Sequence, residues 1–237
     1  MKGWQGRDLA MLTGISRENQ KISATPNTIA FCPICNVQLR PKCGAINIWH
    51  FAHTTKDACD PWYEPESDWH REWKQFIDNN HREVIITLNG EKHIADIVTG
   101  IGIIELQHSH LPFTERVKRE AFYKNLIWIV HVKRERFSIR ERPEFKSVYG
   151  EDFEKSMNVS FHWSYPLRWV IKDMCCPTFI DFDDDPYLLK IEKLKHLSPC
   201  RGYGKLVSRK DFYERYLQHA LSEPYTTYLN EGRLFNV

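Results

Sequence analysis

Three polar side chains interrupt an apolar segment of the chain, HIADIVTGIGIIELQHS. Ile, Val and Leu dominate this segment, as in two buried β-strands, yet it also contains Asp96, Glu105 and Gln107. We predict a two-residue turn centred on Gly100 and Ile101, with the glycine first as a type II′ turn requires. Asp96 then lies opposite Glu105 with Cβ atoms about 5 Å apart, and Gln107 shares their face.

Two facing carboxylates in an apolar sheet need a compensating positive charge. Like charges directly opposite each other destabilise a sheet, and burying a carboxylate adds a further cost. Mg²⁺ relieves both costs, because it binds one or two carboxylates together with water and phosphate oxygens. We therefore predict a Mg²⁺ or Mn²⁺ site at Asp96 and Glu105. The alternative is a solvent-exposed face on which both acids bond to nearby basic residues such as Lys92 or His93.

A second group of ligand-type residues lies nearer the N-terminus. Cys32 and Cys35 in FCPICNVQL have the spacing that lets both sulfurs bind one Zn²⁺. His50 and His53 follow in HFAH, and Cys59 comes next. Either both histidines or His53 with Cys59 complete a tetrahedral site, and a histidine left out is a half-buried strand residue. A closed four-ligand site is structural rather than catalytic, because it leaves no open position.

The elements that would position the carboxylates follow from hydrophobic periodicity. Trp69, Trp73 and Phe76 in ESDWHREWKQFIDNN are spaced as one helical stripe, which favours core packing for the two tryptophans. Three segments rich in β-branched residues follow: EVIITLNG, HIADIVTG and IGIIELQ. Apolar residues from Phe113 to Leu126 then recur at helical spacing, and LIWIVHV is a continuous apolar strand. The predicted order is α-β-β-β-α-β.

A family resemblance rests on three motifs in this region: ESDWHREWK, IADIV and IIELQHS. Together with Arg116 and Tyr123 in the following helix, they resemble the nuclease domain of the CoiA-like competence proteins, a branch of the PD-(D/E)XK superfamily. The resemblance covers roughly residues 30–132 and implies a restriction-endonuclease-like αβββαβ core within an α/β (α+β) fold. HFAH also resembles the small zinc-binding module that precedes the core in these proteins.

The resemblance assigns roles to individual positions. Asp96 matches the metal-binding Asp, Glu105 matches the second acid, and Glu66 matches an acid often added by the helix before the sheet. Gln107 stands where most of the superfamily has Lys, and in this it resembles the CoiA-like branch. An amide can orient a phosphate or a water molecule but carries no charge.

Several basic residues could supply the missing charge or bind DNA. His70 and Lys74 follow Glu66 on one helix face, and either could provide a cation or a proton. Nine Lys and Arg against four Glu between residues 115 and 142 give a local excess of +5, typical of either a DNA-backbone footprint or a solvated helix face. The candidates for DNA contact are Arg116, Lys118, Arg119 and Tyr123.

Length and composition favour a folded protein with three parts. The 237 residues are 42% hydrophobic and 13% aromatic, with a net charge of only +2. We predict an N-terminal segment with the zinc module (1–65), the nuclease core (66–140) and a C-terminal extension (141–237) that extends the sheet or binds a protein partner. Because no apolar signal segment and no stretch of ~20 apolar residues occurs, we expect a cytoplasmic protein without membrane contact.

The C-terminal part has weaker signals. CPTFIDFDDDPYLLKI is typical of two strands around an acidic turn, and SRKDFYERYLQHAL of a helix with Ser208 as its N-cap. Cys175, Cys176 and Cys200 have no partner pattern and are interpreted as small hydrophobic residues.

The residues and the resemblance together predict a Mg²⁺-dependent DNA endonuclease or exonuclease. Asp96 and Glu105, with Glu66, would hold the ion while water attacks a phosphodiester. DNA uptake and processing, repair and phage defence are all compatible roles. The rival hypothesis is a catalytically inactive, zinc-containing DNA-binding module that retains the nuclease fold.

Overall fold

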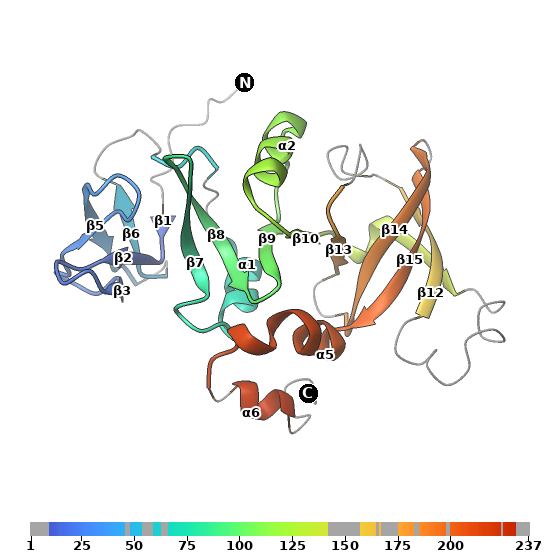
Figure 1. Ribbon diagram of the computed structural model, residues 1–237. Coiled ribbons are helices and arrows are strands. Elements are labelled where there is room, and N and C mark those ends of the chain that lie inside the picture. The colour runs from blue at the N-terminus through green and yellow to red at the C-terminus, as the bar shows by residue number, and fades with distance from the viewer. Residues whose placement is uncertain are drawn as a thin grey trace. The chain divides into compact units, whose positions relative to one another are not determined.

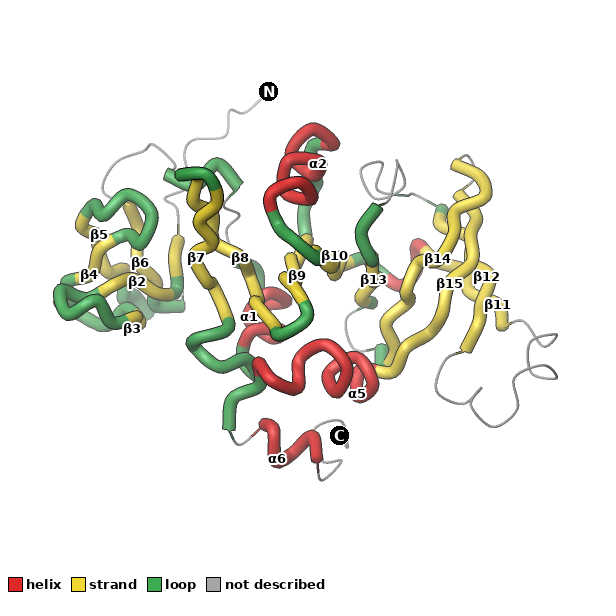
Figure 2. The backbone as a smooth tube through the Cα atoms, viewed as in Figure 1, coloured by secondary structure: helices red, strands yellow, loops and turns green. Residues whose placement is uncertain are grey.

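Two compact units make up the chain (Figure 1). The computed structural model describes residues 10–45, 48–53, 59–62, 66–141, 157–164, 166, 175–182, 185–197, 200–223 and 225–230. The first unit comprises Met1–Arg71 with Glu83–Ile94, and the second Glu72–Arg82 with Ala95–Val237. Strands dominate both units and helices are few, as expected for a mixed α/β protein (Figure 2). The predicted division near residues 65 and 140 stays a prediction.

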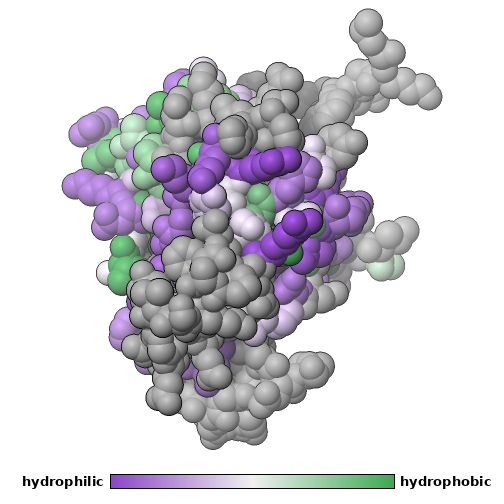
Figure 3. Space-filling view, turned by 90° about the vertical axis from the view of Figure 1, so that its right-hand side faces the viewer, coloured by the Kyte–Doolittle hydropathy of each residue, from purple (hydrophilic) through white to green (hydrophobic). Residues whose placement is uncertain are grey.

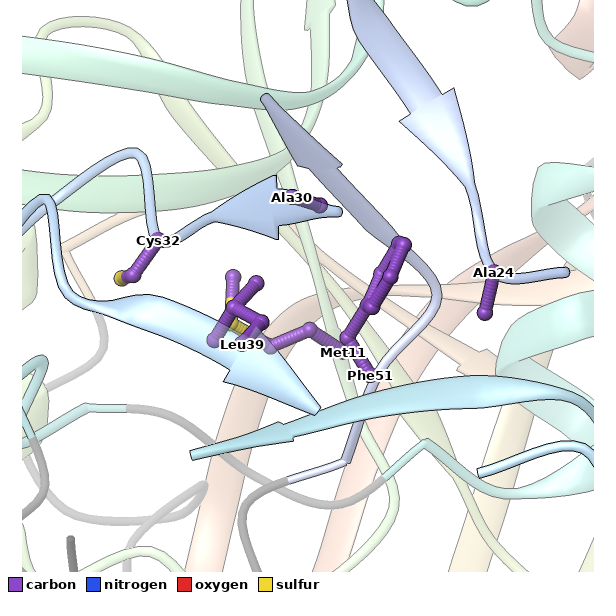
Figure 4. Close-up of a cluster of buried hydrophobic side chains, with 6 residues drawn as sticks. All are labelled: Met11, Ala24, Ala30, Cys32, Leu39 and Phe51. Atoms are coloured by element: carbon purple, nitrogen blue, oxygen red, sulfur yellow. The ribbon is translucent and has the colours of Figure 1, made fainter. Parts of the chain in front are cut away.

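Short antiparallel strands build the sheet of the first unit. Within its described residues the order is β1-β6-β5-β4-β2-β3. The strands are β1 (Ala10–Met11), β2 (Thr13–Ile15), β3 (Lys21–Ser23), β4 (Ala30–Phe31), β5 (Gln38–Lys42) and β6 (His50–His53). Their core is small, and Cys32 lies in it beside Leu39, with Met11 and Phe51 nearby (Figure 4). So few buried side chains stabilise a unit of this size only weakly.

The predicted α-β-β-β-α-β order is present. Its elements are α1 (Asp68–Lys74), β7 (Arg82–Leu88), β8 (Glu91–Thr99), β9 (Gly102–Gln107), α2 (Phe113–Phe122) and β10 (Leu126–His131). Asn89 and Gly90 join β7 to β8 with positive φ at both residues, as a type I′ hairpin requires. Trp69 and Trp73 are buried, as the helical stripe predicts, but α1 ends at Lys74, before Phe76.

Strands from the C-terminal part extend the sheet beyond β10. The described strands follow the order β11-β12-β15-β14-β13-β10-β9-β8-β7. β10 is parallel to both β9 and β13, whereas the pairs β11–β12, β12–β15, β15–β14, β14–β13 and β9–β8 are antiparallel. The added strands are β11 (Phe137–Glu141), β12 (Met157–Trp163), β13 (Thr178–Asp181), β14 (Tyr187–Leu197) and β15 (Cys200–Ser208), with a 3₁₀ turn η1 (Arg134–Arg136) before β11. The predicted pair of strands around the acidic turn is therefore confirmed as β13 and β14.

Helical turns follow β15. Ser208 is the N-cap, and its side chain accepts a hydrogen bond from the Asp211 backbone N–H, as predicted. The expected single helix changes its hydrogen-bonding pattern along its length. It is divided into α5 (Arg209–Phe212), a π segment η4 (Tyr213–Leu217) and a 3₁₀ segment η5 (Gln218–Ala220), and α6 (Tyr225–Asn230) follows. No described helix has the length and apolar character needed to cross a membrane.

The buried face of α2 differs from the apolar spacing in the sequence. Arg116, Arg119 and Phe122 are buried, whereas Val117 and Ala121 are exposed. The arginines can be buried because carboxylates neutralise them there, and this compensation is invisible to hydrophobic periodicity.

Candidate functional site

The β8–β9 hairpin has the predicted register. Ile97 pairs with Ile104, and Thr99 pairs with Gly102, so Gly100 and Ile101 form the two-residue tip. The Thr99 hydroxyl donates to the Gly102 carbonyl over 2.9 Å and closes the turn. Continuing the same register places Asp96 opposite Glu105 on one face.

Gly102, not Gly100, is the glycine that this hairpin requires. The expected type II′ turn needs positive φ at Gly100, but Gly100 is not among the residues with positive φ, and a Cβ there would meet nothing within 4 Å. At Gly102 a Cβ would lie 2.1 Å from the Asn125 carbonyl oxygen. The chain before β10 therefore packs directly against the start of β9, and only a glycine allows that approach.

Asp96 and Glu105 replace part of the backbone ladder with side-chain bonds. The Asp96 backbone N–H donates to Glu105 Oε1 over 3.3 Å, and the Leu106 N–H donates to Asp96 Oδ2 over 2.9 Å. Glu105 is 3% exposed, whereas the Asp96 side chain is 22% exposed. Each acid is thus held by the strand that carries the other.

Two cations compensate the two acids. Lys74 Nζ at the end of α1 lies 2.7 Å from Asp96 Oδ1. Arg119 of α2 donates from Nη1 to Glu105 Oε2 over 2.9 Å, and its Nη2 reaches Glu115 Oε1 at 2.6 Å. The sequence left open whether basic residues pair with these acids. They do, but the partners are Lys74 and Arg119 rather than neighbours on the hairpin.

Opposing effects determine the pKa of Glu105. Burial, followed by the nearby Asp96 carboxylate, raises the pKa of Glu105 to about 8, against the opposing effect of Arg119. A carboxyl with this pKa holds a proton far more readily than an exposed glutamate. Any further positive charge at the hairpin would favour its ionised form.

Gln107 completes the polar face of β9. It lies two residues after Glu105, so the strand alternation places both side chains on one face. Gln107 is buried, and its Nε2 donates to the Ser109 carbonyl over 3.2 Å. This contact fixes the amide at the carboxyl end of β9.

Glu66 and His70 belong to the first compact unit, whereas Asp96 and Glu105 belong to the second. His70 is buried, and its Nδ1 lies 2.8 Å from the Ser67 hydroxyl. The predicted participation of Glu66 and His70 in the carboxylate site stays a prediction.

The candidates for DNA contact differ in exposure. Arg116 and Tyr123 are buried like Arg119, whereas Lys118 is exposed. Arg116 Nε lies 3.4 Å from Glu120 Oε1, so this guanidinium also has a carboxylate beside it. Of the four, Lys118 is the one whose charge faces solvent, and the role of the set in DNA binding stays a prediction.

The turn between β4 and β5 carries the Cys-x-x-Cys pair. The Cys32 backbone N–H donates to the Val37 carbonyl over 2.8 Å, and Asn36 closes the turn in the left-handed region with φ of 58°. Asparagine tolerates this conformation better than most residues do. The Ile34 N–H points to Cys32 Sγ at 3.4 Å. The local fold therefore holds this sulfur in place.

Four donors converge at this turn: Cys32, Cys35, His53 and Cys59. Their ligand atoms lie within 4.8 Å of one another, with Cys32 Sγ 3.4 Å from Cys59 Sγ, and Cys59 Sγ 3.5 Å from His53 Nε2. A tetrahedral Zn²⁺ with bonds of about 2.3 Å has ligand separations of about 3.8 Å. The four side chains can hold a zinc ion.

His50 is outside this group. Its Nδ1 lies 2.8 Å from the Ile48 carbonyl oxygen. His50 is the first residue of β6, whereas His53 is the last. Of the two ligand sets that the sequence left open, the structure favours the one with His53 and Cys59.

Burial sets the protonation of these ligands. It raises the pKa of the Cys32 and Cys59 thiols and lowers the pKa of His53. The neutral imidazole is the form that binds a metal, whereas the thiols must release protons when a metal binds.

A polar cluster around Asp60 and His93 was not predicted from the sequence. Asp60 Oδ1 lies 2.9 Å from His93 Nδ1, and Asp60 Oδ2 accepts a hydrogen bond from the Ile94 N–H. The Trp62 ring stacks on the His93 ring, with 3.3 Å between the ring centroids. These contacts fasten the segment after Cys59 to β8. The only sequence signal was an acid next to the last zinc candidate.

Cys175 does not behave as a small hydrophobic residue. It is exposed, and its Sγ donates to Glu120 Oε2 over 2.9 Å, while Cys176 lies in the same group. Cys200, by contrast, is buried as expected. The Trp128 indole and Arg116 also contact the Glu120 carboxylate, so its charge is already balanced within the chain.

Comparison with known protein families gives a match in the N-terminal part of the chain. Residues 15–61 match the family model of the N-terminal domain of competence protein CoiA. This range contains the four converging donors and ends just after Cys59. No curated protein sequence and no solved structure matches the chain. The match confirms the resemblance to CoiA-like proteins over residues 15–61, which are similar to the N-terminal domain of competence protein CoiA.

Proposed function

We propose that the protein is a metal-dependent deoxyribonuclease of the PD-(D/E)XK type that acts on DNA in competence. The CoiA N-terminal domain indicates a competence-related role. The hairpin with opposed Asp96 and Glu105 carries the proposal of nuclease activity. It lies within the order α1-β7-β8-β9-α2-β10, with β10 parallel to β9, which is compatible with the αβββαβ core.

The donor set at the hairpin fits a hard divalent cation. Asp96 and Glu105 offer carboxylate oxygens, which are the ligands that Mg²⁺ and Mn²⁺ prefer, and a carboxylate can accept several contacts at once. Mg²⁺ or Mn²⁺ would supply Lewis acidity for phosphodiester hydrolysis. Such an ion would bind beside Lys74 and Arg119 or displace one of them.

Neighbouring side chains supply the remaining functions. The Lys74 ammonium, next to Asp96, can contact a non-bridging phosphate oxygen or donate a proton to the leaving group. The Gln107 amide can orient a water molecule but cannot neutralise charge. Lys74 therefore supplies the positive charge that a lysine at position 107 would provide in most of the superfamily.

Cleavage assays with matched variants test this proposal. Wild type is incubated with single-stranded, duplex and branched DNA in Mg²⁺ or Mn²⁺, alongside Glu105→Gln, Asp96→Asn and the control Glu115→Gln. Glu115 also contacts Arg119 but lies outside the hairpin, so its variant should keep activity. We expect the first two variants to fall to background. Cleavage that survives Glu105→Gln, or persists in EDTA, would contradict the proposal.

A second candidate function is an inactive zinc-containing DNA-binding module. The observation that favours it is the pairing of both carboxylates with Lys74 and Arg119, which gives each acid a counter-ion from the chain itself. Retention of DNA by the wild type without cleavage of any substrate would support this module.

A further inference from the structure

One face of the C-terminal strands is polar and basic, whereas the other is buried. Along β12 the side chains of Val159, Phe161 and Trp163 are at most 4% exposed and belong to the core. The alternate residues Ser160 and His162 point to the opposite face. The four strands β11, β12, β15 and β14 thus present a continuous polar surface, which we name the basic face.

Cross-strand register aligns the basic face into two rows. One row runs from Arg140 through Ser160 and Tyr203 to Lys193. The next row runs from Ser138 through His162 to Arg201. Because neighbouring strands lie about 4.8 Å apart, the first row spans three such intervals and the second spans two. Hydroxyl, aromatic and cationic groups therefore recur across the sheet.

A hollow of about 620 Å³ lies on the basic face. Its main polar lining residues are Ser138, Arg140, Ser160, Lys195, Arg201 and Tyr203. No acidic residue is among its described lining residues. Seen from the right-hand side of Figure 1, the surface between the parts drawn in grey is largely hydrophilic (Figure 3).

The cations of the hollow are available to an external anion. Arg140, Lys195 and Arg201 are exposed, and among the residues that the structure describes none of the three forms an ion pair. Lys195 Nζ lies 4.4 Å from the centre of the Tyr203 ring, so Tyr203 positions this ammonium at the hollow. This arrangement differs from that of α2, where the buried guanidiniums form ion pairs with carboxylates.

We propose that the basic face binds the phosphodiester backbone of a single nucleic-acid strand. Guanidinium, ammonium and hydroxyl groups are the side chains that contact phosphate oxygens. An open antiparallel sheet with basic and aromatic side chains is a common platform for single strands, which follow a groove by charge and stacking. The absence of acids from the described lining excludes cationic ligands and favours a polyanion. This site goes beyond the proposed cleavage, because it uses none of the hairpin residues.

Fluorescence anisotropy with labelled oligothymidine tests the basic face in the full-length protein. EDTA is included so that cleavage cannot contribute. The variant combines Arg140→Ala, Lys195→Ala and Arg201→Ala, and the control combines Arg17→Ala, Lys92→Ala and Arg215→Ala, three exposed basic residues outside these four strands. Both variants lose the same charge. We expect the first to weaken binding at least about tenfold and the control to change it less than about twofold.

The salt dependence gives a second readout. Each phosphate contact to a single strand contributes about 0.7 to the slope of log affinity against log salt. Loss of three contacts should therefore reduce the magnitude of the slope by about 2. An equal loss of affinity in both variants, or an unchanged affinity in the first, would overturn the proposal.

Two further arms keep the test decisive. Thermal unfolding shows whether the triple variant is folded, and if it is not, the single change Arg201→Glu at an exposed strand position carries the test. Poly-glutamate competes as a probe for an acidic protein partner. Competition by poly-glutamate as strong as by unlabelled oligothymidine would assign the face to such a partner instead. Cleavage is measured separately, so wild type that binds but does not cut leaves this inference standing.

Discussion

The Cys/His group and the carboxylate hairpin compensate their polar donors in opposite ways. At the turn after β4 the ligand atoms of the four donors lie within 4.8 Å of one another, and Cys59 contacts both Cys32 and His53. At the hairpin each carboxylate has a cation supplied by a helix, Lys74 from α1 and Arg119 from α2. The first group gathers metal-type ligands at one point, whereas the second has counter-ions supplied by the chain.

This difference separates a structural role from a catalytic one. A closed set of soft ligands in a weakly stabilised unit converts metal binding into folding free energy. A pair of hard ligands with internal counter-ions can exchange a metal without unfolding, as catalysis requires. The comparison therefore predicts that metal loss unfolds one region and only inactivates the other.

The largest expected effect is on zinc removal. Structural Zn²⁺ contributes about 10–16 kcal/mol in small zinc-finger peptides, so Cys59→Ser or His53→Ala should leave residues 10–62 unfolded. Elemental analysis should show one equivalent of zinc in the wild type and none in the variants. Limited proteolysis should cut the variants within this range.

Two neighbouring residues provide matched controls for the zinc prediction. Cys43 and His50 lie in the same unit but outside the converging group, so Cys43→Ser and His50→Ala should keep the metal. Zinc loss in His50→Ala together with zinc retention in Cys59→Ser would instead support the other ligand set.

The second effect tests the balanced site by removing one partner. Arg119→Met leaves the buried Glu105 carboxylate without its counter-ion, and breaking a buried pair costs about 3–5 kcal/mol. Because Arg119 lowers the Glu105 pKa, its loss raises that pKa further. A raised folded pKa contributes stability below the unfolded value and loses it as the pH rises. Chemical denaturation should thus show a larger deficit above pH 8 than near neutral pH, and an equal deficit at both would contradict this account.

The third effect concerns the turn that sets the hairpin register. Gly102→Ala forces a Cβ against the Asn125 carbonyl, and such overpacking costs about 1–3 kcal/mol. Gly100→Ala is the matched control, since a Cβ there has open space. Equal melting temperatures for the two variants would show that the close approach is relaxed at little cost.

The sequence predicted the parts of the structure that depend on local pattern. Strand alternation and the turn placed Asp96 opposite Glu105, and the order of helices and strands followed from periodicity. The CxxC spacing identified Cys32 and Cys35. The basic face was not predicted, because the alternation of polar and apolar residues in MNVSFHW gains its meaning only from the neighbouring strands.

Features that depend on distant residues were missed. The burial of Arg119 requires Glu105 from another element, and a mixed-charge helix is more often solvated. The choice of Gly102 over Gly100 depends on Asn125, which follows a whole helix later. The sequence could not decide whether Cys59 or His50 completes the zinc site. The pairing of β5 with β6 decides it, because the register determines which histidine faces the turn.

The smallest expected effect tests whether Lys74 and Mg²⁺ compete for the Asp96 carboxylate at the hairpin. Lys74→Met removes the counter-ion of Asp96, whose side chain is 22% exposed, so water replaces part of the lost interaction and the cost is about 1 kcal/mol. The uncompensated carboxylate should then bind Mg²⁺ more tightly than in wild type. Mg²⁺ should therefore raise the melting temperature of Lys74→Met more than that of wild type. An equal or smaller rise would mean that Lys74 and the metal do not share Asp96.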